Sequence, residues 1–210
     1  MSGAQQVTFM NQRSFGLIIG QAYGGGFYAG QISTTGDGVA THNLVIGPAS
    51  SAMANRDWKT TATDTAGTSS DIDGPTNSSN MNDASHPAAQ FCESLTIGGF
   101  SDWYMPAANE LEVCYFNLKP TTLVNNTSSG INANAVPARA SNYTSDTPPQ
   151  TSATIFRDTE AESFGTPSYW SSTQAATVTR GRVQAFDNGD QATSLKDTSN
   201  RVRAVRRVPV

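Results

Sequence analysis

Two stretches near the carboxyl end, Tyr-Trp-Ser-Ser-Thr at 169–173 and Arg-Val-Arg-Ala-Val-Arg-Arg at 201–207, decide the fold. In each, aromatic or β-branched residues alternate with polar ones, a pattern typical of strands. Residues 174–200 between them are mostly short and polar. Two well-specified strands therefore frame a segment whose side chains packing does not dictate. Such a segment is typical of a binding face on a rigid scaffold.

We expect this segment to contact a ligand through its small and polar side chains. The predicted ligand-binding residues are Gln174, Ala176, Thr177, Thr179, Arg180, Arg182, Gln184, Asp187, Asn188, Asp190, Gln191, Thr193, Ser194 and Asn200. Within this segment, the run from Asp187 to Asp190 contains Asn-Gly, which is the strongest short-range signal for a tight hairpin turn. We therefore expect a hairpin turn there rather than a calcium site.

The composition indicates one globular domain with many turns. The 210 residues suffice for one hydrophobic core. Charged residues make up only 14%, which argues against disorder, while glycine, proline, serine, threonine and asparagine are abundant. We expect a single domain at 15–210. Residues 1–14 are short and polar, and they are either an arm for attachment or oligomerisation or a frayed terminus.

The charge balance and the amino terminus exclude several kinds of partner. A net charge of −4 argues against binding to nucleic acid, which requires an excess of positive charge on the protein surface. The first residues lack the charged-then-apolar pattern of a signal peptide, and no apolar run approaches the roughly 18 residues of a membrane span. We therefore expect a soluble product made in the cytoplasm, no membrane insertion and no binding to nucleic acid.

The amino-terminal half contains strand signals followed by a long polar stretch. Residues 15–19 read as a strand, and residues 27–33 and 42–46 read as a hairpin around the turn Asp37-Gly38. From 49 to 85 there is little periodicity, so we expect a long loop that Trp58 anchors to the core.

Two helices and one shorter one follow from apolar spacing and capping residues. The first should begin near Ser85 or His86, with Asp83 or Ser85 as N-cap and Pro87 in the first turn, and stop at Gly98-Gly99. The second follows Pro106 and ends before Pro120. It places Leu111, Cys114, Tyr115 and Leu118 on one core-facing stripe. A short helix is expected around 152–156.

The sequence predicts neither catalysis nor a metal or other cofactor. Cys92 and Cys114 fall on helix core faces, which favours buried free thiols, although their separation leaves a disulfide open. His42 and His86 have local structural explanations and lack a neighbouring nucleophile or base. The run 71–74, Asp-Ile-Asp-Gly, begins like a calcium loop but lacks the later ligands. On their helix, Glu110 and Glu112 lie two positions apart and do not face one another.

Aromatic and basic residues in the framework are expected to be structural. Trp103 and Trp170 should pack in the core rather than stack on a ligand. Asp102 should cap or bridge nearby loops. The arginines at 201, 203, 206 and 207 alternate with apolar residues, so we expect a solvated strand face with salt bridges to a neighbouring subunit.

Three stretches in this order resemble one family. The first is Gly-Gly-Phe-Ser-Asp-Trp-Tyr-Met-Pro at 98–106 with Asn-Glu-Leu at 109–111, and the others are Tyr-Trp-Ser-Ser-Thr at 169–173 and Arg-Val-Arg-Ala-Val-Arg at 201–206. This set is similar to the DUF1566 or Lcl C-terminal domain family, and most similar to its phage tail-fibre versions. The resemblance covers the chain from about residue 24 onward, including the hairpin that ends at Ile46.

The resemblance implies a C-type-lectin-like fold of the α+β class, in which two short helices flank small antiparallel sheets and long loops cover one end. In some phage and bacterial members, retroelements diversify the region that corresponds to residues 174–200. Related phage sequences often carry several Tyr or Trp residues there, whereas this chain has none in that segment. Since Tyr and Trp supply most of the binding energy in rigid paratopes, we expect a more polar and weaker face, or a glycan partner.

These inferences predict a non-enzymatic virion protein of a phage tail fibre or tail tip. Its partners would be a host cell-surface receptor, either protein or glycan, and other phage virion proteins, and a homotrimer would raise the avidity of weak sites. The alternative is a structural virion component, such as a capsid decoration or tail-tip cap, that binds only other phage proteins.

Overall fold

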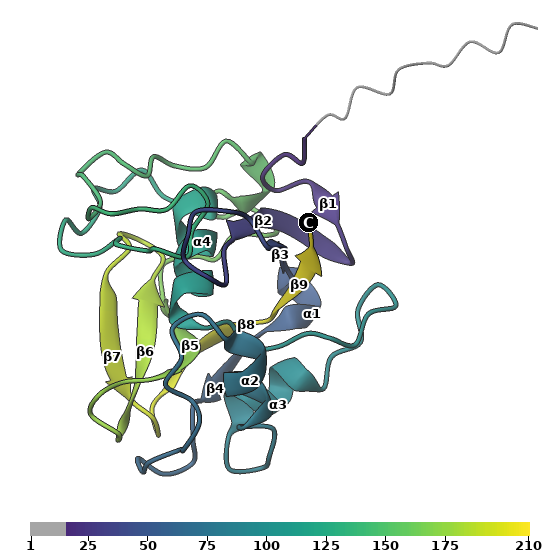
Figure 1. Ribbon diagram of the computed structural model, residues 1–210, viewed down its shortest axis with the longest axis vertical. Helices are drawn as coiled ribbons and strands as arrows, with labels where there is room; N and C mark the ends of the chain where they lie inside the picture. Colours follow the sequence, from purple (N-terminus) through teal and green to yellow (C-terminus); the bar gives the residue numbers. More distant parts are fainter. Residues whose placement is uncertain (1–15) are drawn as a thin grey trace, which may run out of the picture.

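The computed structural model describes residues 16–210, so the predicted arm at 1–14 lies outside the described residues. The chain forms two sheets (Figure 1). The first has the order β1-β2-β3-β9, with β1 (Ala22–Tyr23), β2 (Gly26–Ile32), β3 (His42–Ile46) and β9 (Val205–Pro209). The second has the order β4-β8-β5-β6-β7, with β4 (Met53–Asp57), β5 (Ser168–Gln174), β6 (Arg180–Ala185), β7 (Gln191–Leu195) and β8 (Ser199–Arg203). Pairing is antiparallel except between β5 and β8.

The helices are short, and the fold is mixed α+β. They are α1 (Ala49–Ala52), α2 (Gly74–Ser79), α3 (Pro87–Glu93), α4 (Ala108–Leu118) and the 3-10 helix η1 (Thr154–Phe156). The α+β prediction is confirmed, as are the hairpin of β2 and β3, the helix α4 and the short helix near 152–156. The structure has more short helices than the two expected, because α1 and α2 lie in the stretch 49–85, for which the sequence predicts a loop.

The predicted strand at 15–19 is wrong over its described residues, because the chain turns there. The Gln21 N–H donates to the Ile18 carbonyl at 2.9 Å, and the Gly20 N–H donates to the Tyr28 carbonyl at 2.8 Å. Gly20 has a φ of +79°, which favours glycine. Ile18 is consequently exposed at 68% rather than packed in a sheet.

Helix α3 begins where predicted, with Pro87 in its first turn, but its N-cap and its end differ from the prediction. Its N-cap is His86, and neither Asp83 nor Ser85 occupies that position. The Asp83 carboxylate instead accepts from the Ser85 N–H at 2.7 Å and contacts the His86 ring at 2.9 Å. The helix stops at Glu93, with Ser94 as its C-cap. Gly98-Gly99 instead lie in a tight turn that pairs Ile97 with Phe100.

The predicted final strand is two strands that belong to different sheets. Ala204 separates β8 from β9; its N–H donates to the Ala52 carbonyl and its carbonyl accepts from the Gly47 N–H, both at 2.9 Å. In Figure 1 the chain runs from β8 into β9 and so joins the two sheets. The motif at 201–207 therefore spans the junction at which the chain passes from the second sheet to the first.

Two clusters of buried side chains fill the core. The predicted stripe of α4, which is Leu111, Cys114, Tyr115 and Leu118, lies in the first cluster. The second cluster contains Trp58, Trp103 and Trp170, all at most 1% exposed, which confirms their packing roles. The Trp58 indole N–H donates to the Ser171 carbonyl at 2.9 Å and so anchors its segment to β5.

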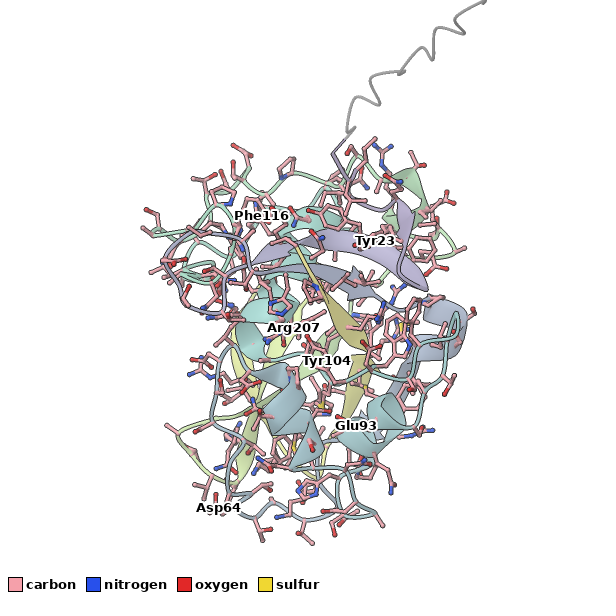
Figure 2. The ribbon with its side chains drawn as sticks, turned by 45° about the vertical axis from the view of Figure 1, so that its right-hand side comes forward. Tyr23, Asp64, Glu93, Tyr104, Phe116 and Arg207 are labelled. Atoms are coloured by element: carbon pink, nitrogen blue, oxygen red, sulfur yellow. The ribbon has the colours of Figure 1, made fainter. Side chains whose placement is uncertain are left out.

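The solvated arginine face predicted at 201–207 is wrong for most of its members. Arg203 has no exposed surface and pairs with Glu162 at 2.6 Å, while Arg206 is 7% exposed and pairs with Asp102 at 2.7 Å. Figure 2 shows Arg207 beside Tyr104 in the middle of the molecule, where Arg207 pairs with Glu110 at 2.8 Å. Arg203 and Arg206 are buried and Arg207 is half-buried. The three lie where β8 passes into β9 and the two sheets join, and each guanidinium meets a carboxylate from a distant segment.

Candidate functional site

A concave pocket of about 450 Å³ lies between the strands β5, β6 and β7 and the first turn of α4. Figure 1 shows α4 beside these strands, with β7 at the edge of the sheet. The lining residues come from five parts of the chain, namely Ala108, Asn109, Leu111, Ile131, Ser171, Ala175, Ala176, Arg182, Val183, Gln184, Gln191, Ala192 and Thr193. A pocket of this size is within the usual range for small-molecule sites.

The register of β6 against β7 decides which side chains face the pocket. Arg182 lies opposite Thr193, and Gln184 lies opposite Gln191. Because side chains alternate along a strand, these four share one face of the hairpin. The other face packs on the core, since a Cβ added to Gly181 would come within 2.9 Å of the Trp58 ring.

Hydrogen bonds fix the orientation of two pocket amides. The Gln184 Nε2 donates to the Gly189 carbonyl at 2.8 Å, which leaves the Gln184 Oε1 as an acceptor. The Gln191 Oε1 accepts from the Gly130 N–H at 3.0 Å, which leaves the Gln191 Nε2 as a donor. In each case the backbone partner can play only one role, so the amide has only one orientation.

Helix α4 contributes a third oriented amide at its first turn. The Asn134 Nδ2 donates to the Ser33 carbonyl, so its Oδ1 accepts from the Asn109 Nδ2, both at 2.8 Å. The Asn109 Oδ1 therefore remains an acceptor. The backbone N–H groups of Ala107, Ala108 and Asn109 all donate to acceptors within the protein, so this helix start does not form an anion site.

Arg182 is the one charged residue among those that line the pocket. Its Nε lies 3.5 Å from the Asp71 Oδ1, and both side chains are about half exposed. A loose pair of this kind contributes little to stability, so the guanidinium is free to meet a ligand.

The structure divides the predicted ligand-binding residues into three groups. The pocket is lined by Ala176, Arg182, Gln184, Gln191 and Thr193. The predicted turn, with Asp187, Asn188 and Asp190, forms, and the Asp190 carboxylate accepts from the Asn126 side chain at 2.6 Å. The remaining residues lie outside the pocket: Gln174, Thr177, Thr179, Arg180, Ser194 and Asn200.

Several of these residues hold the framework rather than a free surface. Gln174 binds Asp64 at 2.7 Å and the Thr65 N–H at 2.8 Å, which ties β5 to the segment after β4. Ser194 lies on the opposite face of β7 from Thr193, where it meets Asn200 at 3.4 Å. Part of the segment 174–200 therefore makes framework contacts, and the residues that line the pocket are a subset of those expected to bind the ligand.

Sequence reasoning missed the part of the pocket that the helix and a distant turn supply. Asn109 and Ile131 were assigned no binding role, and Leu111 was expected only in the core, although it forms part of the pocket floor. No local pattern marks these residues. Asn109 and Leu111 reach the pocket through the packing of α4 on β5 and β6, and Ile131 reaches it from the loop after α4.

The residues that could suggest catalysis have structural surroundings. The His86 ring contacts Asp83 at 2.9 Å and Thr65 at 3.0 Å, and it meets the Trp58 ring edge-on. Cys92 and Cys114 are buried free thiols, as predicted, and burial raises the pKa of each. Over residues 16–210, no group of three His, Cys, Asp or Glu side chains is arranged to hold a metal ion.

Among the described residues, none of the helices has the length and apolar character needed to cross a membrane.

The family model described as the Lcl C-terminal domain matches residues 53–206. The three motifs at 98–111, 169–173 and 201–206 all lie within that match, whereas the hairpin that ends at Ile46 lies before it. No curated protein and no solved structure matches the chain.

Proposed function

Since this chain belongs to the Lcl C-terminal domain family, we propose that it is a non-enzymatic binding protein of a phage virion that holds a host-surface molecule. The face it uses is the pocket between α4 and the β6–β7 hairpin. The phage tail-fibre or tail-tip location and the kinship with retroelement-diversified proteins are part of this proposal, and they rest on the resemblance of the three motifs.

The observation that carries the proposal is a set of oriented polar groups on rigid elements. Arg182, Gln184, Gln191 and Thr193 project from paired strands, and backbone contacts hold two of them. Side chains held in this way lose little conformational entropy when a ligand binds. The pocket presents hydrogen-bonding groups without a nucleophile and base in contact, which favours recognition over catalysis.

The proposal includes a C-type-lectin-like framework and a homotrimer. Two small sheets joined through β8 and β9, with short helices and long connections, agree with the content of such a domain. Three copies would multiply the modest affinity of one polar pocket. The mass of the purified full chain in solution, measured by light scattering, tests the trimer directly.

Binding to intact candidate host cells tests the function. The test variant is Arg182→Ala, Gln191→Ala, Thr193→Ala, which removes three pocket groups. The matched control is Asp197→Ala, Thr198→Ala, Ser199→Ala, three exposed residues of the same carboxyl-terminal region that do not line the pocket. We expect the wild type and the control to bind and the pocket variant to lose binding, at equal thermal stability. Equal binding by both variants would contradict the proposal.

The second candidate is a structural virion component, and exposed apolar residues at the pocket and beside it favour it. Ile131 is 59% exposed and Leu195 is 43% exposed. Apolar side chains with a polar rim also occur at subunit interfaces. If Ile131→Ser with Leu195→Ser prevents assembly of particles, while the pocket variant leaves both assembly and host attachment intact, the structural function is the correct one.

A further inference from the structure

The structure assigns the pocket a ligand class: we propose that it binds a neutral 2-acetamido sugar, with the acetamido group at the floor and the hydroxyl groups at the rim. This inference rests on the proposed function for the location of the site and adds the chemistry of the ligand. An acetamido group offers one N–H donor, one carbonyl acceptor and one methyl group, and the pocket supplies a partner for each.

The N–H donor of the ligand finds an acceptor at the floor. Gln184 is only 2% exposed, its Nε2 is committed to Gly189, and its Oε1 accepts no hydrogen bond within residues 16–210. Only two fully enclosed side-chain atoms of the described chain lack a partner, the Asp71 Oδ1 and the Arg139 Nε. The Gln184 Oε1 is therefore not enclosed, and since Gln184 lines the pocket, this oxygen opens onto it. A buried acceptor without a protein partner is expected to have a water or ligand partner.

The other polar groups of the pocket match a carbonyl and several hydroxyls. The Gln191 Nε2 and the Arg182 guanidinium are donors, the Asn109 Oδ1 is an acceptor, and the Thr193 hydroxyl can play either role. Sugar hydroxyls donate and accept at once, so an alternation of donors and acceptors along a rim suits them.

The apolar lining fits a methyl group rather than an aromatic or charged ligand. Leu111 lies at the floor, and Ile131, four alanines and Val183 are also among the lining residues. Among these lining residues there is no aromatic ring on which a planar ligand could stack. The single charge, Arg182, already has Asp71 nearby, so the pocket does not present the excess positive charge that a polyanion requires.

Titration of the ¹⁵N-labelled full chain with single sugars tests the assignment. The probes are N-acetylglucosamine and N-acetylgalactosamine, with glucose and glucosamine as comparisons. We expect the N-acetylated sugars to shift the side-chain amide signals of Gln184 and Gln191 in a saturable way. The comparison sugars should bind at least tenfold more weakly, because one lacks the acetamido group and the other brings an ammonium beside Arg182. Equal binding of glucose, or no saturable shift with either N-acetylated sugar, would overturn the assignment.

Two tryptophan substitutions provide a matched pair. Thr193→Trp fills the pocket, whereas Thr198→Trp places the same side chain on the exposed turn after β7, which does not line the pocket. Since both positions are exposed, both variants should fold. Binding of the N-acetylated sugar should be lost in the first variant and kept in the second. Loss in both, or in neither, would place the sugar elsewhere.

Gln184→Met tests the acceptor itself. Methionine keeps the length of the side chain and removes the amide oxygen, so affinity for the N-acetylated sugar should fall about tenfold while that for glucose stays the same. An unchanged preference for the acetamido group would contradict the role of Gln184. If this variant is destabilised through loss of the Gly189 contact, the tryptophan pair still decides the location of the site.

The two proposals fail in different ways. Attachment to host cells that depends on Arg182, Gln191 and Thr193, together with no binding of N-acetylated sugars, would overturn the ligand class and leave the proposed function intact. Saturable sugar binding at the pocket without attachment to any host cell would support the ligand class and overturn the proposed function.

Discussion

Arg207 and Glu110 form an ion pair at 2.8 Å across 97 positions of the chain, and the Glu110 side chain has no exposed surface. Tyr104 donates its hydroxyl to the same carboxylate. Glu112, two positions along α4, instead meets Arg139 and accepts from the Tyr143 hydroxyl at 2.6 Å. The two glutamates therefore belong to separate structural networks and do not form a catalytic pair.

We expect Arg207→Ala to destabilise the fold by about 3–5 kcal/mol, because it leaves the buried Glu110 carboxylate without its cation. Burial already raises the pKa of Glu110, and loss of the arginine should raise it further. The control, Arg180→Ala, removes a partly exposed side chain and should cost no more than about 0.5 kcal/mol. Urea unfolding measures both, and equal costs would contradict the burial argument.

Lys196 predicts a pH dependence of stability at alkaline pH. Its ammonium donates to the Thr63 carbonyl at 3.0 Å and lies 4.1 Å from the Trp58 ring. Burial, with Lys59 nearby, lowers its pKa from 10.5 to about 8. The unfolded chain therefore binds more protons than the folded one between these values, so the contribution of Lys196 is complete above 10.5 and is lost as pH falls through about 8.

The measurement is the difference in unfolding free energy between the wild type and Lys196→Met. We expect this difference to shift in favour of the wild type as pH rises from 7 to 10. Lys59→Met removes the neighbouring cation, so it should raise the Lys196 pKa and weaken the pH dependence of this difference. A difference that stays constant, or that shifts toward the variant, would show that the Lys196 pKa is not lowered in the folded protein.

Two glycines with similar backbone angles should respond differently to alanine. Gly189 has a φ of +78°, and an added Cβ would come within 2.3 Å of the Tyr115 ring. Gly99 has a φ of +82° and open space around it. Gly99→Ala should cost about 1–2 kcal/mol from backbone strain alone. Gly189→Ala should cost about 1–3 kcal/mol more because the core must move.

Thermal or chemical unfolding of both variants gives the comparison. The pocket supplies a second readout, since the Gly189 carbonyl holds Gln184 in place. Gly189→Ala should therefore change the Gln184 side-chain signal, whereas Gly99→Ala should not. Equal stabilities would mean that the turn relaxes without disturbing Tyr115.

The two thiols should be inert in the native protein. Cys92 and Cys114 are fully buried, and burial raises the pKa of both, so little thiolate is available at neutral pH. Reaction with a thiol reagent should be slow in buffer and complete in denaturant, where two thiols per chain should react. Rapid labelling of either cysteine in the folded protein would contradict the described packing.

Local patterns predicted the elements with strong periodicity or turn chemistry. The hairpin of β2 and β3, the helix α4 with its core stripe and the turn at 187–190 follow from short-range signals, and the structure has them all. The strand expected at 15–19 failed because the apolar run there ends in a turn at Gly20, which β propensity alone does not reveal. The arginines at 203, 206 and 207 were misplaced because alternation gives the two faces of a strand but not what covers each face.

The sequence by itself determined the α+β class, the framework tryptophans and the family, since each depends on local spacing or on short motifs. Only the tertiary structure decided which polar groups are free to bind. Gln184 and Gln191 look alike in the sequence, but contacts with Gly189 and Gly130 leave one as an acceptor and the other as a donor. Asn109 joins them because α4 packs on β6. Such contacts link residues that are far apart in the chain, and no local pattern encodes which partner each side chain will meet.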